Sequence, residues 1–367
     1  LLGQVAGGMK NCTFTNTTLT GGGSFFGIMA VCDGNIEDVT VTNSYVEADA
    51  GYVGGLSGYL RGDLINVQAK GDDSGKYGYQ VIGTSYIGGL VGRIYSTDHE
   101  TNGHALIGGP DYTSDLAEGE ERTDLKDDGW YSKLISEDKD YRPDRTGSVS
   151  DQYIYDSLSC NYALIKNVTL ENINVAASIA GGIAAEVSYI KKAMGYGYTL
   201  IEDVNASEVQ VQVLNRPASN EAYTGGLIGL APTVMVHGVT LDAMTVEVTS
   251  GSHVGGMFGY VNYRADYDYS AYGSGTDRVQ YFLSVLDDIT LTNSSAQGGS
   301  YTGGLIGSSP HWSMNHNIKL DHNVVLGQGN RVGGMAGVIN NSYTTDLTVQ
   351  NQQVYNSGES QYTGGIM

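Results

Sequence analysis

The chain has 367 residues and a formal net charge of −21, and it contains 53 glycines but only 5 prolines. This acidity, with no basic patch to offset it, argues against a nucleic-acid partner. No apolar stretch is long enough for membrane insertion. The composition fits an extracellular surface, cation binding or a high-salt setting.

A short glycine phrase returns nine times along the chain, and its clearest copy is Gly225-Gly226-Leu227-Ile228-Gly229. The other copies open at Gly54, Gly88, Gly181, Gly255, Gly303, Gly333 and Gly364, and a diverged copy, GSFFG, opens at Gly23. Successive copies start 31, 34, 93, 44, 30, 48, 30 and 31 residues apart. A fixed period interrupted only by additions predicts a solenoid.

The third position of the glycine phrase is always large and apolar, and we expect it to form one ladder in the core. These residues are Phe25, Leu56, Leu90, Ile183, Leu227, Met257, Leu305, Met335 and Ile366. The glycine pair suits a tight corner where no side chain fits or where φ is positive.

A second phrase lies between the glycine phrases, as in IEDVTVTNSYV over Ile36–Val46. Its apolar and polar residues alternate and are rich in Val, Ile and Thr, which predicts half-buried strands. Asparagine or aspartate recurs at the bends, where a short polar side chain tolerates a left-handed turn. We expect such bends at Asn43, Asn172, Asp242, Asn293 and Asn351.

One repeat is too short to bury its own apolar face, so neighbouring repeats must stack and pair their strands. The predicted fold class is therefore all-β: a parallel β-helix solenoid with coils of about 30 residues and loop insertions on one flank. Parallel crossovers favour right-handed coils. A leucine-rich-repeat horseshoe and a propeller are the rivals, but the former lacks its consensus here and the period is short for the latter.

In chain order, we expect β-helix coils over 1–94, an acidic Tyr-rich insertion over 95–163, and further coils over 164–367 with smaller insertions at 189–199 and 262–284. The first insertion carries 16 Asp or Glu against 6 Lys or Arg, and the three together hold 15 of the 27 tyrosines. All three lengthen the same connection, so they should leave the rod at one corner.

Loops on a rigid scaffold often carry function, and aromatic side chains dominate interface energetics. We therefore predict that the insertions contact a partner: a glycan, a host or neighbouring-cell protein, or another copy of the chain. The candidate binding residues are Trp130, Tyr131, Tyr141, Tyr196, Tyr198, Tyr263, Tyr267, Tyr269 and Tyr272. The alternative is a solvated acidic cover without a partner.

No cofactor is expected apart from Ca²⁺, for which the candidate ligands are Asp127, Asp128, Asp266 and Asp268. An EF-hand starting at Asp124 fails, because its third position is Lys126 and its twelfth is Ile135. The loose cluster of His311, His316 and His322 around Trp312 is weak as a zinc site.

The motifs HExxH, GxSxG, Walker A and CxxC are absent from the sequence. Arg264, Asp266, Asp268 and Arg278 offer acid–base groups, but nothing fixes their geometry. The prediction is that the chain is not an enzyme. Cys12 and Cys32 are interpreted as small buried residues, with a pairing between adjacent coils as the alternative.

The phrases GGLSG, GGLVG, GGLIG, GGMFG and GGMAG, each followed by stretches such as IEDVTVTNSYV, resemble the GLUG-motif repeats of large bacterial surface proteins. These include adhesin-like proteins and the N-terminal region of IgA1-specific metallopeptidases. The resemblance covers the chain outside the insertions and implies a repeat fold in a surface setting. The peptidase motif is absent, so protease activity does not carry over.

The expected function is a noncatalytic structural or adhesive segment of a large secreted or cell-surface prokaryotic protein, acting as a stalk, adhesin or filament subunit. The alternative is the recognition region of a secreted enzyme, a metallopeptidase or a polysaccharide-active one, whose catalytic domain lies outside this chain. The expected location is extracellular or at the cell surface.

Overall fold

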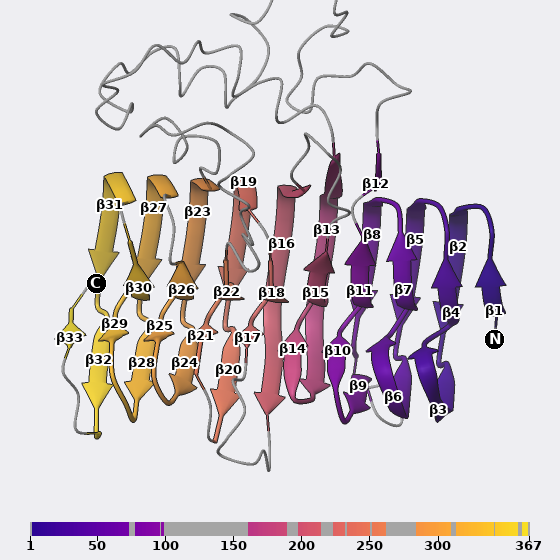
Figure 1. Cartoon of the computed structure of the whole chain (residues 1–367), viewed down its shortest axis with the longest axis horizontal. Helices are drawn as coiled ribbons and strands as arrows, with labels where there is room; N and C mark the ends of the chain where they lie inside the picture. The colour runs from indigo at the N-terminus through magenta and orange to yellow at the C-terminus, as the bar shows by residue number, and fades with distance from the viewer. Residues whose placement is uncertain are drawn as a thin grey trace, which may run out of the picture.

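The structure is a computed structural model that describes residues 2–72, 78–95, 97–98, 161–188, 197–213, 223–231, 233–249, 252–261, 284–309, 313–340, 342–358 and 362–365. Coils stack along the long axis of the molecule from the N-terminus to the C-terminus (Figure 1). Every regular element in these ranges is a strand, and all of the strands except the two-residue β12 pair coil on coil in parallel. The predicted parallel β-helix is confirmed. No helix in the described ranges is long and apolar enough to cross a membrane.

Each coil starts on what we call the first wall. Its strands are β2 (Met9–Thr15), β5 (Ile36–Thr42), β8 (Leu64–Lys70), β13 (Asn161–Ala176), β16 (Gly197–Val213), β19 (Thr233–Asp242), β23 (Ser284–Thr292), β27 (Ser313–Asp321) and β31 (Ser342–Gln350). Two of these, β13 and β16, continue around the bend into the next wall, because their later residues pair with β9 and β20.

The second wall follows, and short strands lead from it into the glycine corner. The second-wall strands are β3 (Thr18–Phe26), β6 (Tyr45–Gly54), β9 (Tyr79–Gly83), β20 (Thr245–Val248), β24 (Ser295–Gly298), β28 (Val324–Gly327) and β32 (Gln353–Asn356). The short strands are β10 (Tyr86–Gly88), β14 (Ile179–Gly181), β17 (Thr224–Gly225), β21 (Val254–Gly255), β25 (Thr302–Gly303), β29 (Val332–Gly333) and β33 (Thr363–Gly364).

After the glycine corner the chain enters the third wall, a nine-stranded sheet. Its strands are β1 (Leu2–Val5), β4 (Met29–Cys32), β7 (Ser57–Arg61), β11 (Val91–Tyr95), β15 (Ala184–Ser188), β18 (Ile228–Leu230), β22 (Phe258–Tyr260), β26 (Ile306–Ser309) and β30 (Ala336–Ile339). Beyond it, β12 (Thr97–Asp98) pairs antiparallel with the start of β13.

Inward-pointing side chains from all walls form one continuous core. The apolar residues at the third position of the glycine phrase form the predicted ladder. From Leu56 to Leu305, the backbone N–H of each residue donates to the carbonyl of the equivalent residue in the next coil, so their side chains stack. The buried members are Leu56, Leu90, Ile183, Leu227, Met257, Leu305 and Met335. Alternation of apolar and polar residues in the sequence thus sets which side of each strand is buried.

The glycine pair exists because its corner has no room for a side chain. A Cβ built on Gly226 would lie 2.0 Å from the carbonyl oxygen of Gly256, and one built on Gly225 would lie 2.1 Å from that of Ile228. Neither glycine has a positive φ. The glycine pair is therefore explained by the close approach of the backbone and not by a positive φ.

The assignment of Phe25 to the core ladder is wrong. The register pairs Phe25 with Tyr52 and Phe26 with Val53, which places Gly27 opposite Gly54. Ile28, fully buried, therefore occupies the apolar position of this coil. GSFFG resembles the glycine phrase in letters, but the pairing of β3 with β6 decides the alignment.

The predicted left-handed bends are confirmed at Asn43, Asn172, Asn293 and Asn351, whose φ values lie between 50° and 53°. The prediction is wrong by one residue at Asp242, because Ala243 takes the positive φ of 52°. The Asp242 carboxylate instead accepts hydrogen bonds from the Thr292 hydroxyl and the Asn293 amide of the next coil. A short acceptor beside the bend thus ties it to its neighbour.

The interruptions of the described chain that follow β11, β15 and β22 share one corner. Tyr95 and Ser188, which end β11 and β15, are partners in the third wall, and Tyr260 ends β22 of the same sheet. The chain re-enters on the first wall in β13, β16 and β23. The last residues of the first two expected insertions, 161–163 and 197–199, already belong to β13 and β16.

Candidate functional site

A crease runs along the rod where the second and third walls meet at the glycine corner. The last glycine of the phrase forms its floor: a Cβ on Gly58 would lie 2.3 Å from the backbone N of Phe26, and one on Gly259 would lie 2.5 Å from that of Thr224. Because the two backbones touch, side chains on both sides of the corner meet above it.

The residue two places before the glycine corner is aromatic in most coils and forms one column on the second-wall side. In chain order the column is Phe25, Tyr52, Tyr86, Ile179, Tyr223, His253, Tyr301, Arg331 and Tyr362. The third-wall column that faces it includes Tyr59, Arg93, Glu186, Leu230 and Tyr260. We call these two columns and their immediate neighbours the aromatic crease.

The N-terminal part of the aromatic crease is a network of Tyr, Arg and Glu. Glu186, with a side chain only 7% exposed, pairs with Arg93 at 3.3 Å and accepts hydrogen bonds from Tyr52 and Ser188. The Arg93 guanidinium also lies 5.2 Å from the ring centroid of Tyr52 and donates to Ser188. A buried carboxylate is tolerated here because three groups satisfy it.

Burial, and after it the nearby Glu186 carboxylate, raise the pKa of the Tyr52 hydroxyl to about 12. The phenol therefore stays protonated and donates its hydrogen bond to Glu186. Tyr59 contacts both Phe25 and Tyr95, with ring centroids 5.0 and 5.9 Å away.

The C-terminal part of the aromatic crease is a stack of rings. His253 stacks on Tyr223 and Tyr301 with centroid distances of 5.0 and 4.6 Å, and Tyr260 packs edge-on from the third wall. Arg331 continues the stack between Tyr301 and Tyr362. These contacts hold successive coils together.

Stacking decides what the aromatic crease can present to a ligand. Ring faces within the stack are covered by neighbouring rings, and Ile179, Tyr223 and Leu230 in the middle of the crease are buried, so the half-exposed Tyr and Arg side chains lie mainly in its N-terminal part. Arg61 lies over Tyr59 and pairs with Asp33 at 3.5 Å. Because Arg61 and Arg93 each have a carboxylate partner, the N-terminal part of the crease is close to neutral on an acidic molecule, and it suits hydrogen bonding to a polar, uncharged ligand.

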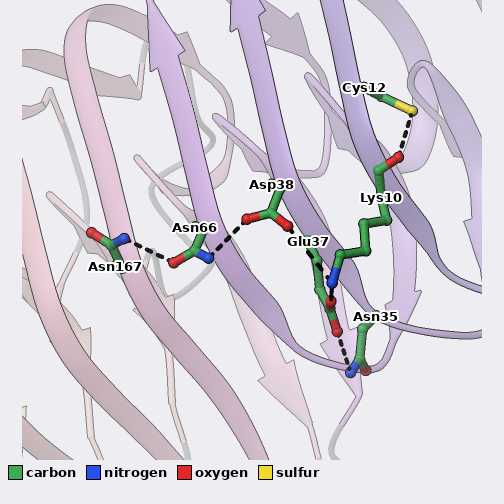
Figure 2. Close-up of polar contacts among 7 residues, drawn as sticks. All are labelled: Lys10, Cys12, Asn35, Glu37, Asp38, Asn66 and Asn167. Atoms are coloured by element: carbon green, nitrogen blue, oxygen red, sulfur yellow. Dashed lines mark hydrogen bonds and ion pairs between the residues drawn. The ribbon is translucent and has the colours of Figure 1, made fainter.

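A second set of polar columns lies on the outer face of the first wall. Inside each first-wall strand, one outward residue comes directly before a residue of positive φ. These outward residues lie in register and are Lys10, Glu37, Ile65, Lys166, Glu202, His237, Asp287, His316 and Thr345. We call this column the charge ladder. Figure 2 shows its first rung, in which the Lys10 ammonium reaches Glu37 at 2.8 Å. Lys10 lowers the pKa of Glu37 by hydrogen bonding.

The residue after each charge-ladder position has a positive φ, and it is Asn or Asp in every described coil except that of β19, where it is Gly238. Asn66 donates to Asp38 at 2.8 Å, and Asn167 donates to Asn66 at 2.8 Å, as Figure 2 shows. Their φ values are 54°, 53° and 51° for Asn66, Asp38 and Asn167. Asparagine suits these places because it tolerates the left-handed backbone and can bond both neighbours.

The sequence-predicted site residues lie outside the described residues, apart from Tyr198. They are Trp130, Tyr131, Tyr141, Tyr196, Tyr263, Tyr267, Tyr269, Tyr272 and the carboxylates Asp127, Asp128, Asp266 and Asp268. The backbone of Tyr198 is part of β16, where it pairs with Tyr162 and Thr233.

The described ranges contain no group of three or more His, Cys, Asp or Glu side chains arranged to hold a metal ion. His316 bonds to Asp287 and Asp346, whereas His322 pairs with Asp321. Cys12 and Cys32 are both free: Cys32 is buried, and Cys12 is half-buried against the core. The interpretation as a small buried residue is confirmed for Cys32, whereas Cys12 is only partly buried.

Sequence reasoning missed the aromatic crease, although a signal for it exists. Tyrosine stands two residues before the glycine pair at Tyr52, Tyr86, Tyr223, Tyr301 and Tyr362. Comparison with models of protein families, with curated proteins and with solved structures finds no match for this chain. Function must therefore be argued from the residues themselves.

Proposed function

We propose that this chain is a noncatalytic, adhesive β-helical segment of a large secreted or cell-surface prokaryotic protein, and that its aromatic crease binds an extended, uncharged polysaccharide. The observation that supports the proposal most is the in-register repetition of half-exposed aromatic and arginine side chains in the N-terminal coils of the crease, at Tyr52, Tyr59, Tyr86 and Arg93. A ligand made of repeated units can contact many such coils at once, so weak single contacts add up.

The geometry of the coils favours a lengthwise polysaccharide. Successive coils follow one another at about 4.8 Å, which is close to the advance of one sugar residue in an extended chain. Phenol hydroxyls and guanidinium edges supply hydrogen bonds to sugar hydroxyls, and Tyr and Arg are enriched in binding hot spots. The net charge of −21 disfavours a polyanion. A neutral polysaccharide is therefore the ligand class that fits.

The surface setting is supported by the acidity and by the resemblance of the glycine phrase to GLUG-motif repeats. The Tyr- and Asp-rich insertions stay a predicted second contact surface, whose partner is a glycan, a protein or another copy of the chain. The two surfaces are separable by mutation, because the aromatic crease lies within the strands and turns of the coils.

The test is binding of the chain to immobilised neutral polysaccharides, xylan and a β-glucan, with polygalacturonate as the charged counterpart. The double variant Tyr59→Ala/Tyr95→Ala should weaken binding to the neutral polymers about tenfold or more. Gln68→Ala, on the exposed face of β8, is the matched control and should change nothing. Incubation should release no new reducing ends.

Equal binding by the crease variant and the control would contradict the role of the crease. Release of reducing ends would contradict a noncatalytic function. Deleting residues 262–283 and restoring a short turn, which keeps Ser284 of β23 in place, tests the predicted second surface: loss of binding to cells or proteins with unchanged polysaccharide binding would assign separate partners to the two surfaces.

A further inference from the structure

Four side chains on the charge ladder and next to it connect four successive coils near the C-terminal end. One carboxylate oxygen of Asp287 lies 2.8 Å from Nδ1 of His237, and the other lies 2.5 Å from Nδ1 of His316. Nε2 of His316 lies 3.2 Å from the Asp346 carboxylate. These residues belong to β19, β23, β27 and β31. We call them the histidine clamp.

We propose that the histidine clamp is a pH-sensitive fastening that binds these four coils most tightly in mildly acidic solution and loosens as the solution becomes alkaline. Its central carboxylate, Asp287, is only 8% exposed, so its bonds are shielded from water more than those of a surface pair. A carboxylate that is shared by two imidazoles, one per oxygen, gains most when the imidazoles are cationic.

The groups that face the clamp from the adjoining strands are also acidic. Glu202 and Asp203 lie on β16 beside His237, Asp288 lies next to Asp287 on β23, and Asp346 faces His316 from β31. Lys166 of this face pairs with Glu202 at 2.7 Å, and Lys319, on the same strand as His316, lies on the far side of the bend, opposite Thr290. The field at the clamp therefore favours positively charged histidines.

The shifts of the clamp residues have the signs that this arrangement requires. The hydrogen bond to Asp287 is the largest effect on His237 and raises its pKa above the ordinary 6.5, against the opposing effect of burial. Burial alone would raise the pKa of Asp287, but hydrogen bonds from His237 and His316 outweigh it and hold the pKa below 3.8.

The pH window follows from these directions. Stability from His237 is fully present below pH 6.5 and is lost as pH rises through the raised pKa of the folded state. Stability from Asp287 is present above pH 3.8 and is lost as pH falls through its lowered folded pKa. The clamp is therefore strongest between these two ordinary values and weakens on the alkaline side.

Titration of the histidines by NMR, in the full chain and in Asp287→Asn, tests the proposal. In the unmodified chain His237 should titrate above its ordinary value, because its imidazole bonds to the Asp287 carboxylate. Asp287→Asn keeps the shape of the side chain but removes the charge, and it should lower the proton affinity of His237 about three- to tenfold.

Thermal unfolding at about pH 5.5 and about pH 8.5 supplies the second readout. The difference in Tm between the two pH values should shrink in Asp287→Asn and in His316→Gln, whereas Glu171→Gln, which removes the carboxylate that pairs with Lys70 away from the clamp, should leave the clamp's contribution in place. An ordinary titration of His237 in the unmodified chain would overturn the proposal. So would an unchanged pH dependence of Tm in both clamp variants, and the unmodified chain still decides if a variant does not fold.

Discussion

The two ends of the charge ladder occupy equivalent positions on the same wall but use different chemistry. Near the N-terminus, Lys10 pairs with Glu37 and, further along, Lys166 pairs with Glu202. Near the C-terminus, the same outward position holds His237, Asp287 and His316. Lysine stays charged across the physiological range, whereas histidine changes charge within it.

The comparison separates what the backbone determines from what the side chains determine. Parallel stacking places one outward position of every coil above the next, whatever residue occupies it. The residue then decides whether the resulting pair responds to pH. One scaffold thus carries a pH-independent ladder in its first coils and a pH-dependent one in its last coils.

The largest expected effect is common to both ends and tests whether they share one core. Leu56→Asp and Leu305→Asp each place an unpaired charge at a fully buried position of the apolar ladder. Each should cost about 4 kcal/mol or more of unfolding free energy. Leu56→Met and Leu305→Met should cost less than about 1.5 kcal/mol. Urea unfolding measures both; a large cost at only one end would break the comparison.

A smaller effect is expected at the residue of positive φ that follows each charge-ladder position. This residue is Asn66 near the N-terminus and Gly238 near the C-terminus, with φ of 54° and 67°. Asn66→Ala loses its hydrogen bonds to Asp38 and Asn167 and strains a left-handed backbone, so it should cost about 1–2 kcal/mol. Asn66→Gly loses only the bonds and should cost less. Equal costs for the two variants would show that the backbone strain is unimportant.

The smallest effect is expected when a histidine replaces a lysine in the lysine-containing part of the charge ladder. Lys166→His would place an imidazole beside Glu202 in the position that Lys166 holds at 2.7 Å. The pair is partly exposed, so its contribution should be about 0.3–1 kcal/mol, present below roughly pH 6.5 and lost above it. Chemical unfolding of the variant and the unmodified chain over this pH range measures the difference. Identical pH profiles would show that position alone does not transfer the response.

Much of the fold was predictable because the glycine phrase reports a steric requirement. Leu227 and Met257 lie in the core ladder as expected, since their shared place after the glycine pair fixes their inward direction. The sequence wrongly predicts Phe25 in the core ladder because GSFFG matches the glycine phrase in its letters. In the structure, Phe25 pairs with Tyr52, which shifts the alignment of this coil.

The functional features were harder to predict, because they depend on contacts between coils. His237 and Asp287 are 50 residues apart, and an addition to the regular repeat separates them. Only the register of β19 with β23 brings them together. The aromatic crease left a clearer trace in the tyrosines before the glycine pairs, but its network also needs Glu186, which no local motif marks.

Amide hydrogen exchange, followed strand by strand at about pH 5.5 and about pH 8.5 and corrected for the intrinsic rates, tests the central claim most directly. The account predicts that protection falls at the higher pH in β19, β23, β27 and β31 and stays nearly constant in β5, β8 and β13. A uniform change along the rod, or a larger loss in the N-terminal strands, would contradict it.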